Sequence, residues 1–274
     1  MGVSESQPLS RINVSVSEAA ESTMMAIPPS QLQRRVGLAR ALSKLGFCSR
    51  SAACELIREG RVQLNGRVRH DPETPVQIGR DRVLVDGSPI QSQELVYFML
   101  NKPRGIVTTA SDEKNRETVY SLLSPELPWV APVGRLDKAS EGLLLMTNDS
   151  EWAARITAPT SRVEKVYHVQ IGIAASPQLL QTLQDGVRTD KDEILRVVRA
   201  EILRSGSKNT WIEITLEEGK NRHLRRMFEA LSIEVLRLMR VRIGTLRLGE
   251  LKKGSVRPLT EFEKQQLDAA IRLS

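Results

Sequence analysis

The chain has 274 residues, of which 40% are hydrophobic and 27% charged, and this composition excludes disorder throughout. Lysine and arginine exceed aspartate and glutamate by 7, which points to a polyanionic partner. With 3 His, 3 Trp, 3 Tyr and 4 Phe, the chain has little material for a multi-histidine metal centre or for a surface of stacked aromatics. Cys48 and Cys54 match no metal or redox spacing and fit a reducing compartment.

The first 32 residues predict a flexible tail. They are rich in serine, contain the pair Pro28-Pro29 and show no sustained apolar period. Three glutamates within them argue against a transit peptide. The longest stretch without charged side chains, 166–184, includes His168 and Pro177 and is too polar to span a bilayer. We therefore expect a cytoplasmic protein with no membrane partner.

The positive charge is concentrated in two segments. Residues 34–69 contain nine arginines and lysines against two glutamates, and residues 220–242 contain seven against two. The rest of the chain is therefore net acidic, so the basic residues form patches. Such patches favour contacts with a phosphate backbone, although two solvated helix faces would give the same count.

The first basic segment predicts a small module of two helices and a hairpin. Apolar residues along 36–45 fall on one helical face, and Gly46 ends that helix. Ser49 can cap a second helix, which carries another apolar stripe and ends at Gly60. Asn65-Gly66 then lies between two short alternating segments and is a strong hairpin signal.

This order of elements, carried by the runs 42–50, 56–62 and 64–66, resembles the S4 RNA-binding domain. The resemblance implies that the module grips structured RNA by its backbone and shape rather than by reading bases. The arginines at the corresponding places are Arg50, Arg58, Arg61 and Arg67. We expect this domain to occupy residues 33–92.

Residues 93–274 alternate strands with isolated helices. The expected strands are 96–101, 143–147, 163–173, 194–203, 211–216 and 235–242. The expected helices are 149–156, 176–184, 223–231 and a last one that opens on a capping box of Thr260 and Glu263. Hairpin-like connections such as 205–207 favour a mainly antiparallel sheet of the α+β class over a doubly wound one.

A loop that carries Asp137 runs directly into the apolar segment 143–146. The carboxylate is therefore expected at the lip of a buried sheet, a place where loop residues often perform chemistry. From the residues alone, Asp137 could equally be a turn former or the ion-pair partner of Arg135 or Lys138.

Segment 134–149, which begins Gly-Arg-Leu-Asp, resembles the signature of pseudouridine synthases, in particular the ribosomal-RNA branch that carries an S4 domain in front. Segments 100–105, 165–169 and 218–228 agree with that family in the same order, so the likeness covers residues 36–262. The resemblance implies an enzyme that isomerises a specific uridine of ribosomal RNA. The reaction involves neither redox change nor hydrolysis, so no cofactor and no metal are implied.

By position in these motifs, the resemblance assigns Asp137 as the essential carboxylate, Tyr167 as the tyrosine that stacks on a flipped-out base, and Arg225 as the partner of the aspartate. Tyr167 could instead be a core residue, and Arg225 a phosphate contact. The other basic residues expected to bind RNA here are Arg135, Lys165, Lys220, Arg222 and Arg226. The implied partner is ribosomal RNA or an assembling ribosomal subunit, bound by a monomer.

Two positions depart from the family pattern. Ser140 replaces a frequent threonine but keeps its hydroxyl, and Glu141 adds an acidic neighbour. Two alternatives stay open: a non-catalytic RNA-binding assembly factor on the same fold, and an RNA nuclease or glycosidase that uses Asp137. A nuclease would need a second carboxylate cluster or a histidine pair, and the spacing places neither.

Overall fold

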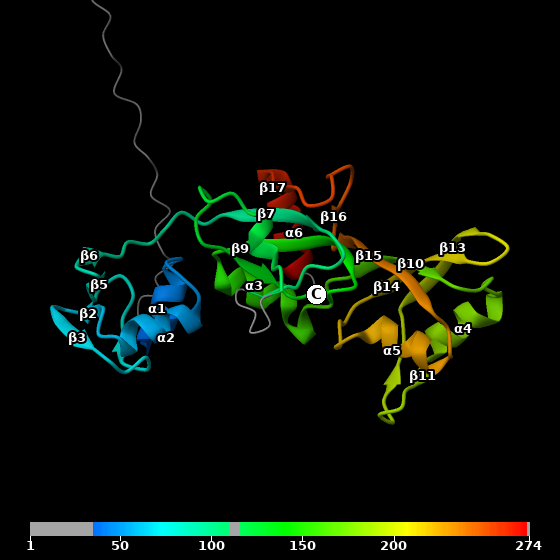
Figure 1. The fold of residues 1–274 in the computed structure, drawn as a ribbon, viewed down its shortest axis with the longest axis horizontal. Helices are drawn as coiled ribbons and strands as arrows, with labels where there is room; N and C mark the ends of the chain where they lie inside the picture. Colours follow the sequence, from blue (N-terminus) through cyan, green and yellow to red (C-terminus); the bar gives the residue numbers. More distant parts are fainter. Residues whose placement is uncertain (1–34, 110–115, 273–274) are drawn as a thin grey trace, which may run out of the picture.

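The structure is a computed structural model that describes residues 35–109 and 116–272. An N-terminal module, blue to cyan in Figure 1, precedes a larger body built on a nine-stranded sheet. Most neighbouring strands of that sheet are antiparallel, and helices pack on it. The expected α+β class, with a small module ahead of a mainly antiparallel sheet, is thereby confirmed. The tail predicted for 1–32 lies outside the described residues.

The N-terminal module is held together by an apolar core between its helices and small sheets, as the periodicity predicts. The helices are α1 (Leu38–Lys44) and α2 (Arg50–Arg58), and the strands are β1 (Val36–Gly37), β2 (Val62–Leu64), β3 (Arg67–Arg69), β4 (Pro75–Val76), β5 (Val83–Val85) and β6 (Ser88–Pro89). Leu38, Leu42, Ala53 and Ile57 are fully buried. Ser49 caps α2, since its hydroxyl accepts a hydrogen bond from the Ala52 amide at 3.1 Å.

The first helix is shorter than its apolar period suggests. It begins at Leu38 because Val36 and Gly37 are extended and pair with Val76 and Pro75 of β4. The hydrophobic spacing fits a helix that starts at residue 36 equally well as one that starts at residue 38. The helix starts at 38 because residues 36 and 37 pair with β4, and local periodicity cannot indicate such a long-range pairing.

The larger body is one sheet whose strand order differs strongly from the chain order. The sheet runs β13-β14-β10-β15-β9-β7-β17, with β8 beside β9 and β16 beside β15. Its strands are β7 (Tyr97–Lys102), β8 (Ala131–Val133), β9 (Glu141–Thr147), β10 (Lys165–Ile171), β13 (Arg199–Ser205), β14 (Thr210–Leu216), β15 (Val235–Ile243), β16 (Leu246–Arg247) and β17 (Val256–Pro258). β9 and β15 are parallel neighbours, and this pair joins the two halves of the sheet.

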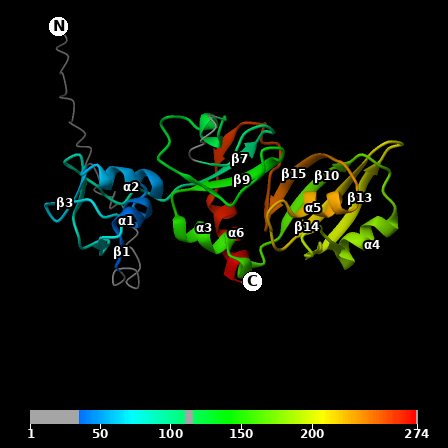
Figure 2. The same cartoon turned by 60° about the horizontal axis from the view of Figure 1, so that its bottom comes forward.

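Helices cover the two halves of the sheet differently, as Figure 2 shows. The helices are α3 (Ser150–Thr157), α4 (Pro177–Asp185), α5 (His223–Ala230) and α6 (Glu261–Arg272), and a short hairpin is formed by β11 (Val187–Arg188) and β12 (Ile194–Leu195). Leu144 and Met146 of β9 belong to the core shared with α4 and α5, whereas Leu143 and Leu145 belong to the core shared with α3 and α6. β9 is therefore buried on both faces, which explains its nearly continuous apolar sequence.

Most predicted elements of this body are confirmed within a few residues, with one exception. The expected strand 194–203 is divided into β12 and β13, because the Val197 amide turns away to the Leu183 carbonyl at 3.0 Å. The expected hairpin after Ser205 is present. Thr260 and Glu263 form the expected capping box, with the Thr260 amide donating to Glu263 at 2.9 Å and the Glu263 amide to Thr260 at 3.2 Å. Among the described residues, no helix is both long and apolar enough to cross a membrane.

Gly142 lies where the backbones of β9 and β15 approach most closely. A Cβ built on Gly142 would lie 2.3 Å from the Arg240 carbonyl oxygen and 2.9 Å from the Arg240 nitrogen. Its φ of +102° is also a value that residues with a side chain rarely adopt. Both observations require glycine at this position.

Gly142→Ala is expected to lower the free energy of unfolding by about 3 kcal/mol or more, because it combines backbone strain with a clash against main-chain atoms. Gly87→Ala is the matched control: its φ is +78°, but its Cβ would meet nothing within 4 Å. That variant should lose only about 1 kcal/mol. Urea unfolding of both variants gives the measurement, and equal losses would show that the close approach is unimportant.

Candidate active site

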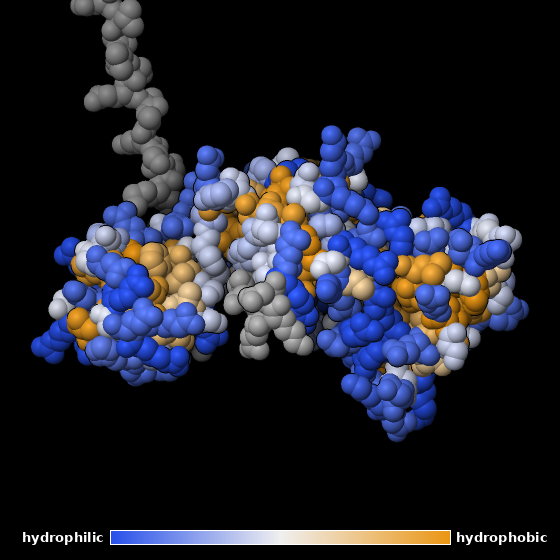
Figure 3. Space-filling view, viewed as in Figure 1, coloured by the Kyte–Doolittle hydropathy of each residue, from blue (hydrophilic) through white to orange (hydrophobic). Residues whose placement is uncertain are grey.

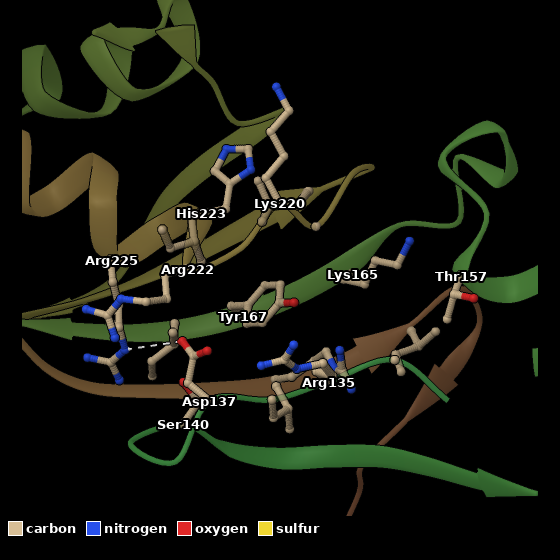
Figure 4. Close-up of a pocket in the computed structure, with 18 of the residues that line it drawn as sticks. Arg135, Asp137, Ser140, Thr157, Lys165, Tyr167, Lys220, Arg222, His223 and Arg225 are labelled. Carbon is tan, nitrogen blue, oxygen red and sulfur yellow. Dashed lines mark ion pairs between the residues drawn. The ribbon is translucent and has the colours of Figure 1, made fainter. Parts of the chain in front are cut away.

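A cavity of about 200 Å³ opens between β10, the loop that follows β8, and the start of α5. Figure 4 shows Asp137 and Arg225 toward one end, Lys165 and Thr157 toward the other, and Tyr167 between them. The polar residues of its lining are Arg135, Asp137, Ser140, Thr157, Lys165, Tyr167, Lys220, Arg222, His223, Arg225 and Arg240. All three residues expected to act in catalysis therefore lie on one cavity.

The loop that carries Asp137 is fastened to the segment after β7 through its backbone. The Ser140 amide donates to the Asp137 carbonyl at 2.9 Å, which closes a turn. The Gly105 amide donates to the Lys138 carbonyl at 2.8 Å, and the Thr108 hydroxyl donates to the Leu136 carbonyl at 2.8 Å. With its backbone held in this way, the loop can present the Asp137 side chain in one position.

Lys102 lies beneath the same loop and is fully buried. Its ammonium donates to the carbonyls of Ser140 at 2.8 Å, Pro103 at 3.1 Å and Asp137 at 3.2 Å. Burial lowers the pKa of Lys102 to about 8, although the charges of Asp137 and Glu141 oppose the shift. Lys102 lies within segment 100–105, one of the segments that resemble the family, but no sequence pattern marked it as a site residue.

Arg225 is the basic residue nearest to the Asp137 carboxylate. Its Nε lies 3.9 Å from Asp137 Oδ2, and its Nη2 donates to the Ala139 carbonyl at 2.9 Å. Burial lowers the pKa of Arg225, the negative charge of Asp137 raises it, and the cations of Arg222 and Arg104 lower it. At this distance the pair is an ion pair rather than a tight hydrogen bond, so Arg225 places its positive charge beside the carboxylate without fixing the position of that carboxylate.

Tyr167 packs in the hydrophobic core and also lines the cavity. Its ring is 9% exposed and belongs to the core cluster of the α4 and α5 side, yet it lines the cavity wall beside Asp137. Its register neighbours are Ile214 on β14 and Arg240 on β15. The open face of a ring held in this way is a flat apolar surface of the kind on which a base can stack.

The neighbours of Asp137 that depart from the family pattern also have defined places. The Ser140 hydroxyl is buried on the cavity wall, with no hydrogen-bond partner among the described residues. Glu141 is buried and pairs with Arg237 at 2.9 Å and Lys253 at 2.5 Å. Burial raises the pKa of Glu141, but the bonds from these two cations outweigh it and hold the pKa below its usual value.

The basic residues around the start of α5 differ in how far they are neutralised. Glu193 pairs with Arg226 at 2.8 Å and with Lys220 at 3.0 Å. Arg222 lines the cavity and adopts a left-handed backbone with φ of +48°. Arg226 does not line the cavity. The expected RNA contacts of these three residues stay predictions.

In the N-terminal module, Arg50, Arg58 and Arg67 are exposed. Arg61 is exposed as well, but it forms a bidentate pair with Asp86 at 2.9 and 2.6 Å. Figure 3 shows hydrophilic side chains around the outer edge of the module, where β3 lies. Of the four arginines of this module that are expected to bind RNA, Arg50, Arg58 and Arg67 are therefore available to a backbone phosphate.

The sequence patterns did not single out three polar residues of the lining, Thr157, His223 and Arg240. His223 is buried, and its Nε2 lies 3.1 Å from the Arg196 carbonyl. Arg240 is 5% exposed and its Nε donates to the Leu143 carbonyl at 2.8 Å. The signal for Arg240 is its two-residue spacing from Leu238, which places both on the inner face of one strand.

Comparisons with known proteins agree on the same family. The sequence model described as RNA pseudouridylate synthase matches residues 96–230, and the S4 domain model matches residues 36–83. Ribosomal large subunit pseudouridine synthase B of Bacillus subtilis (strain 168) is 36% identical over 234 residues, which cover 85% of this chain and 95% of the relative.

A second relative and one solved structure extend this agreement. An RNA pseudouridine synthase of Aquifex aeolicus (strain VF5), named as uncharacterized, is 37% identical over 87% of this chain and 96% of its own length. A crystal structure of a pseudouridylate synthase superimposes with a TM-score of 0.60 at 30% identity and covers 85% of this chain and 99% of the other. Sequence and fold therefore lead to the same group of proteins.

Proposed function

Because the chain belongs to the RNA pseudouridine synthases, which are isomerases, and carries an S4 domain, we propose that it converts one specific uridine of ribosomal RNA to pseudouridine. The observation that carries this proposal is the placement of Asp137, 3.9 Å from Arg225, on a cavity that Tyr167 also lines. The substrate is free ribosomal RNA or an assembling ribosomal subunit.

The reaction explains why these residue types are needed. The N1–C1′ glycosidic bond of uridine breaks, the uracil rotates, and its C5 joins the ribose C1′, while C5 loses a proton and N1 gains one. The Asp137 carboxylate can attack the sugar, add to the uracil ring, or remove a ribose proton. Each route requires an ionised carboxylate in a cavity from which water is excluded, and Arg225 places a positive charge 3.9 Å from it.

A base inside a helical stack cannot reach Asp137, so the target nucleotide must be turned out of the RNA. Tyr167 offers the flat apolar wall against which the uracil can lie. The exposed arginines of the N-terminal module would meanwhile hold the surrounding RNA by its phosphates. Base placement and RNA capture are thus assigned to different parts of the chain.

Asp137→Asn should lower the rate of isomerisation by about 10³-fold or more and leave RNA affinity within a few-fold, because the carboxylate acts in chemistry. Tritium release from ribosomal RNA labelled at C5 of uridine measures turnover, and filter binding measures affinity. A mutant that releases tritium at the wild-type rate would remove Asp137 from the mechanism. Wild-type protein without tritium release would instead favour the assembly-factor alternative.

Arg225→Ala should lower turnover by about 100-fold with little loss of RNA affinity, since it removes the cation beside Asp137. Arg226→Ala is the matched control on the same helix, because Arg226 pairs with Glu193 outside the cavity. The control should alter affinity more than turnover, or neither. If both variants lose turnover and affinity equally, Arg225 is only a phosphate contact.

Deleting residues 1–92 should leave a folded catalytic domain that binds RNA more weakly. The polar contacts across this boundary include the hydrogen bond from the Gln93 amide to the Leu45 carbonyl at 3.2 Å and the pair of Lys44 with Glu151 at 2.5 Å, a partly exposed bridge that contributes about 1 kcal/mol at most. Each lost phosphate contact should reduce the slope of log affinity against log salt by nearly one unit on duplex-like RNA. Turnover at saturating RNA should change much less than affinity.

Binding of the full and shortened chains at several salt concentrations tests this division of labour. An unchanged affinity and salt slope would mean that the basic segment is a solvated surface. An unfolded product, judged by circular dichroism, would show that the domain boundary near residue 92 is misplaced.

A further inference from the structure

The end of the cavity away from Asp137 is built from three cations. They are Arg135, Lys165 and Arg240, which come from the loop after β8, from β10 and from β15. None of them takes part in an ion pair with another described residue at 4.0 Å or less. Figure 4 places Arg135 and Lys165 on the side of Tyr167 opposite Asp137. This end of the cavity thus carries a net positive charge.

Arg240 is the most deeply placed of the three. It is 5% exposed, and among the described residues only its Nε has a hydrogen-bond partner, the Leu143 carbonyl at 2.8 Å. Its Nη2 is buried and has no hydrogen-bond partner among the described residues. A buried guanidinium with an unused donor costs free energy until an acceptor arrives. The register places Arg240 directly beside Tyr167 on the same wall.

Lys165 lies close to Arg240 at the start of β10. Its ammonium donates to the Glu217 backbone carbonyl at 3.0 Å. Burial and the charge of Arg240 together lower the pKa of Lys165 to about 8, against the opposing effect of the Glu217 carboxylate. The positive charges of Lys165 and Arg240 therefore repel each other where both are partly removed from water. A bound anion would offset this repulsion and the cost of desolvating the two charges.

We propose that Arg240 and Lys165 bind a phosphate group of the nucleotide whose uracil lies on Tyr167. This inference rests on the proposed function, because it takes the cavity ligand to be a nucleotide. A phosphate fits better than a uracil carbonyl, since a neutral oxygen would leave the buried charge of Arg240 and the half-buried charge of Lys165 without an anion. A guanidinium also presents its donors in a fork that matches phosphate oxygens.

The cations and the Tyr167 ring suit the two ends of a nucleotide. A nucleotide has an anionic phosphate at one side of the ribose and a flat base at the other. With the phosphate on Arg240 and Lys165 and the base on Tyr167, both ends of the nucleotide would be held in the cavity that Asp137 also lines. The phosphate site would thus help to retain the nucleotide in the cavity that contains the carboxylate.

Titration calorimetry of the full chain with uridine, uridine 5′-monophosphate and uridine 3′-monophosphate tests the proposal. We expect one of the two monophosphates to bind at least about ten-fold more tightly than uridine, and the preferred isomer identifies which phosphate is held. Arg240→Gln and Lys165→Gln should each reduce this preference to about two-fold or less. Lys165→Gln covers the case in which loss of the Arg240 bond to Leu143 unfolds the protein.

Arg242→Gln is the matched control, because Arg242 lies on the same strand but pairs with Glu164 at 3.1 Å and does not line the cavity. It should keep the full preference. Equal binding of uridine and both monophosphates, no measurable monophosphate binding, or a preference that survives in Lys165→Gln would overturn the phosphate site. A lasting phosphate preference in a protein without isomerase activity would instead reject the proposed function and leave the site standing.

Discussion

The close passage of β9 and β15 at Gly142 is the constraint on which the cavity depends. β9 continues the loop that carries Asp137, and β15 supplies Arg240 from the other half of the sheet. Arg240 then crosses back to the Leu143 carbonyl of β9. A wider separation of these two strands would move the carboxylate away from the basic wall and open the apolar cores on both sides of β9.

The elements that sequence patterns predict well are those with long local signals. β9 is a run of apolar residues, α4 begins with a serine cap and a proline, and α6 opens on a capping box. β8 and β17 were not predicted, because each has three residues and contains a proline, Pro132 or Pro258. The parallel pairing of β9 with β15 depends on a register between distant segments, and no local pattern encodes it.

Prediction of the candidate site was limited in the same way, because contacts between distant segments are not encoded in local patterns. Asp137 could be placed at the lip of a buried sheet from its sequence, because an apolar strand follows it closely. Its proximity to Arg225 came only from the family resemblance, since the two lie on segments far apart in the chain. Charge counting identified the basic segment around α5 but could not show that Glu193 neutralises Lys220 and Arg226 while Arg240 stays unpaired. Pairing is a property of the tertiary fold.

The segment between β6 and β7 gives the molecule a fixed geometry for long substrates. Gln93 donates to the Leu45 carbonyl of the N-terminal module at 3.2 Å, and Asn148 of the larger body donates to the Glu94 carbonyl at 2.8 Å. The segment between β6 and β7 is thus hydrogen-bonded to the N-terminal module at Gln93 and to the larger body at Glu94. Under the proposed function, an RNA held by the module would be presented to the cavity at a high effective concentration only when its bound part and its target base are separated by a matching length. The spacing of the two parts would then select RNA by its folded shape, independently of its base sequence.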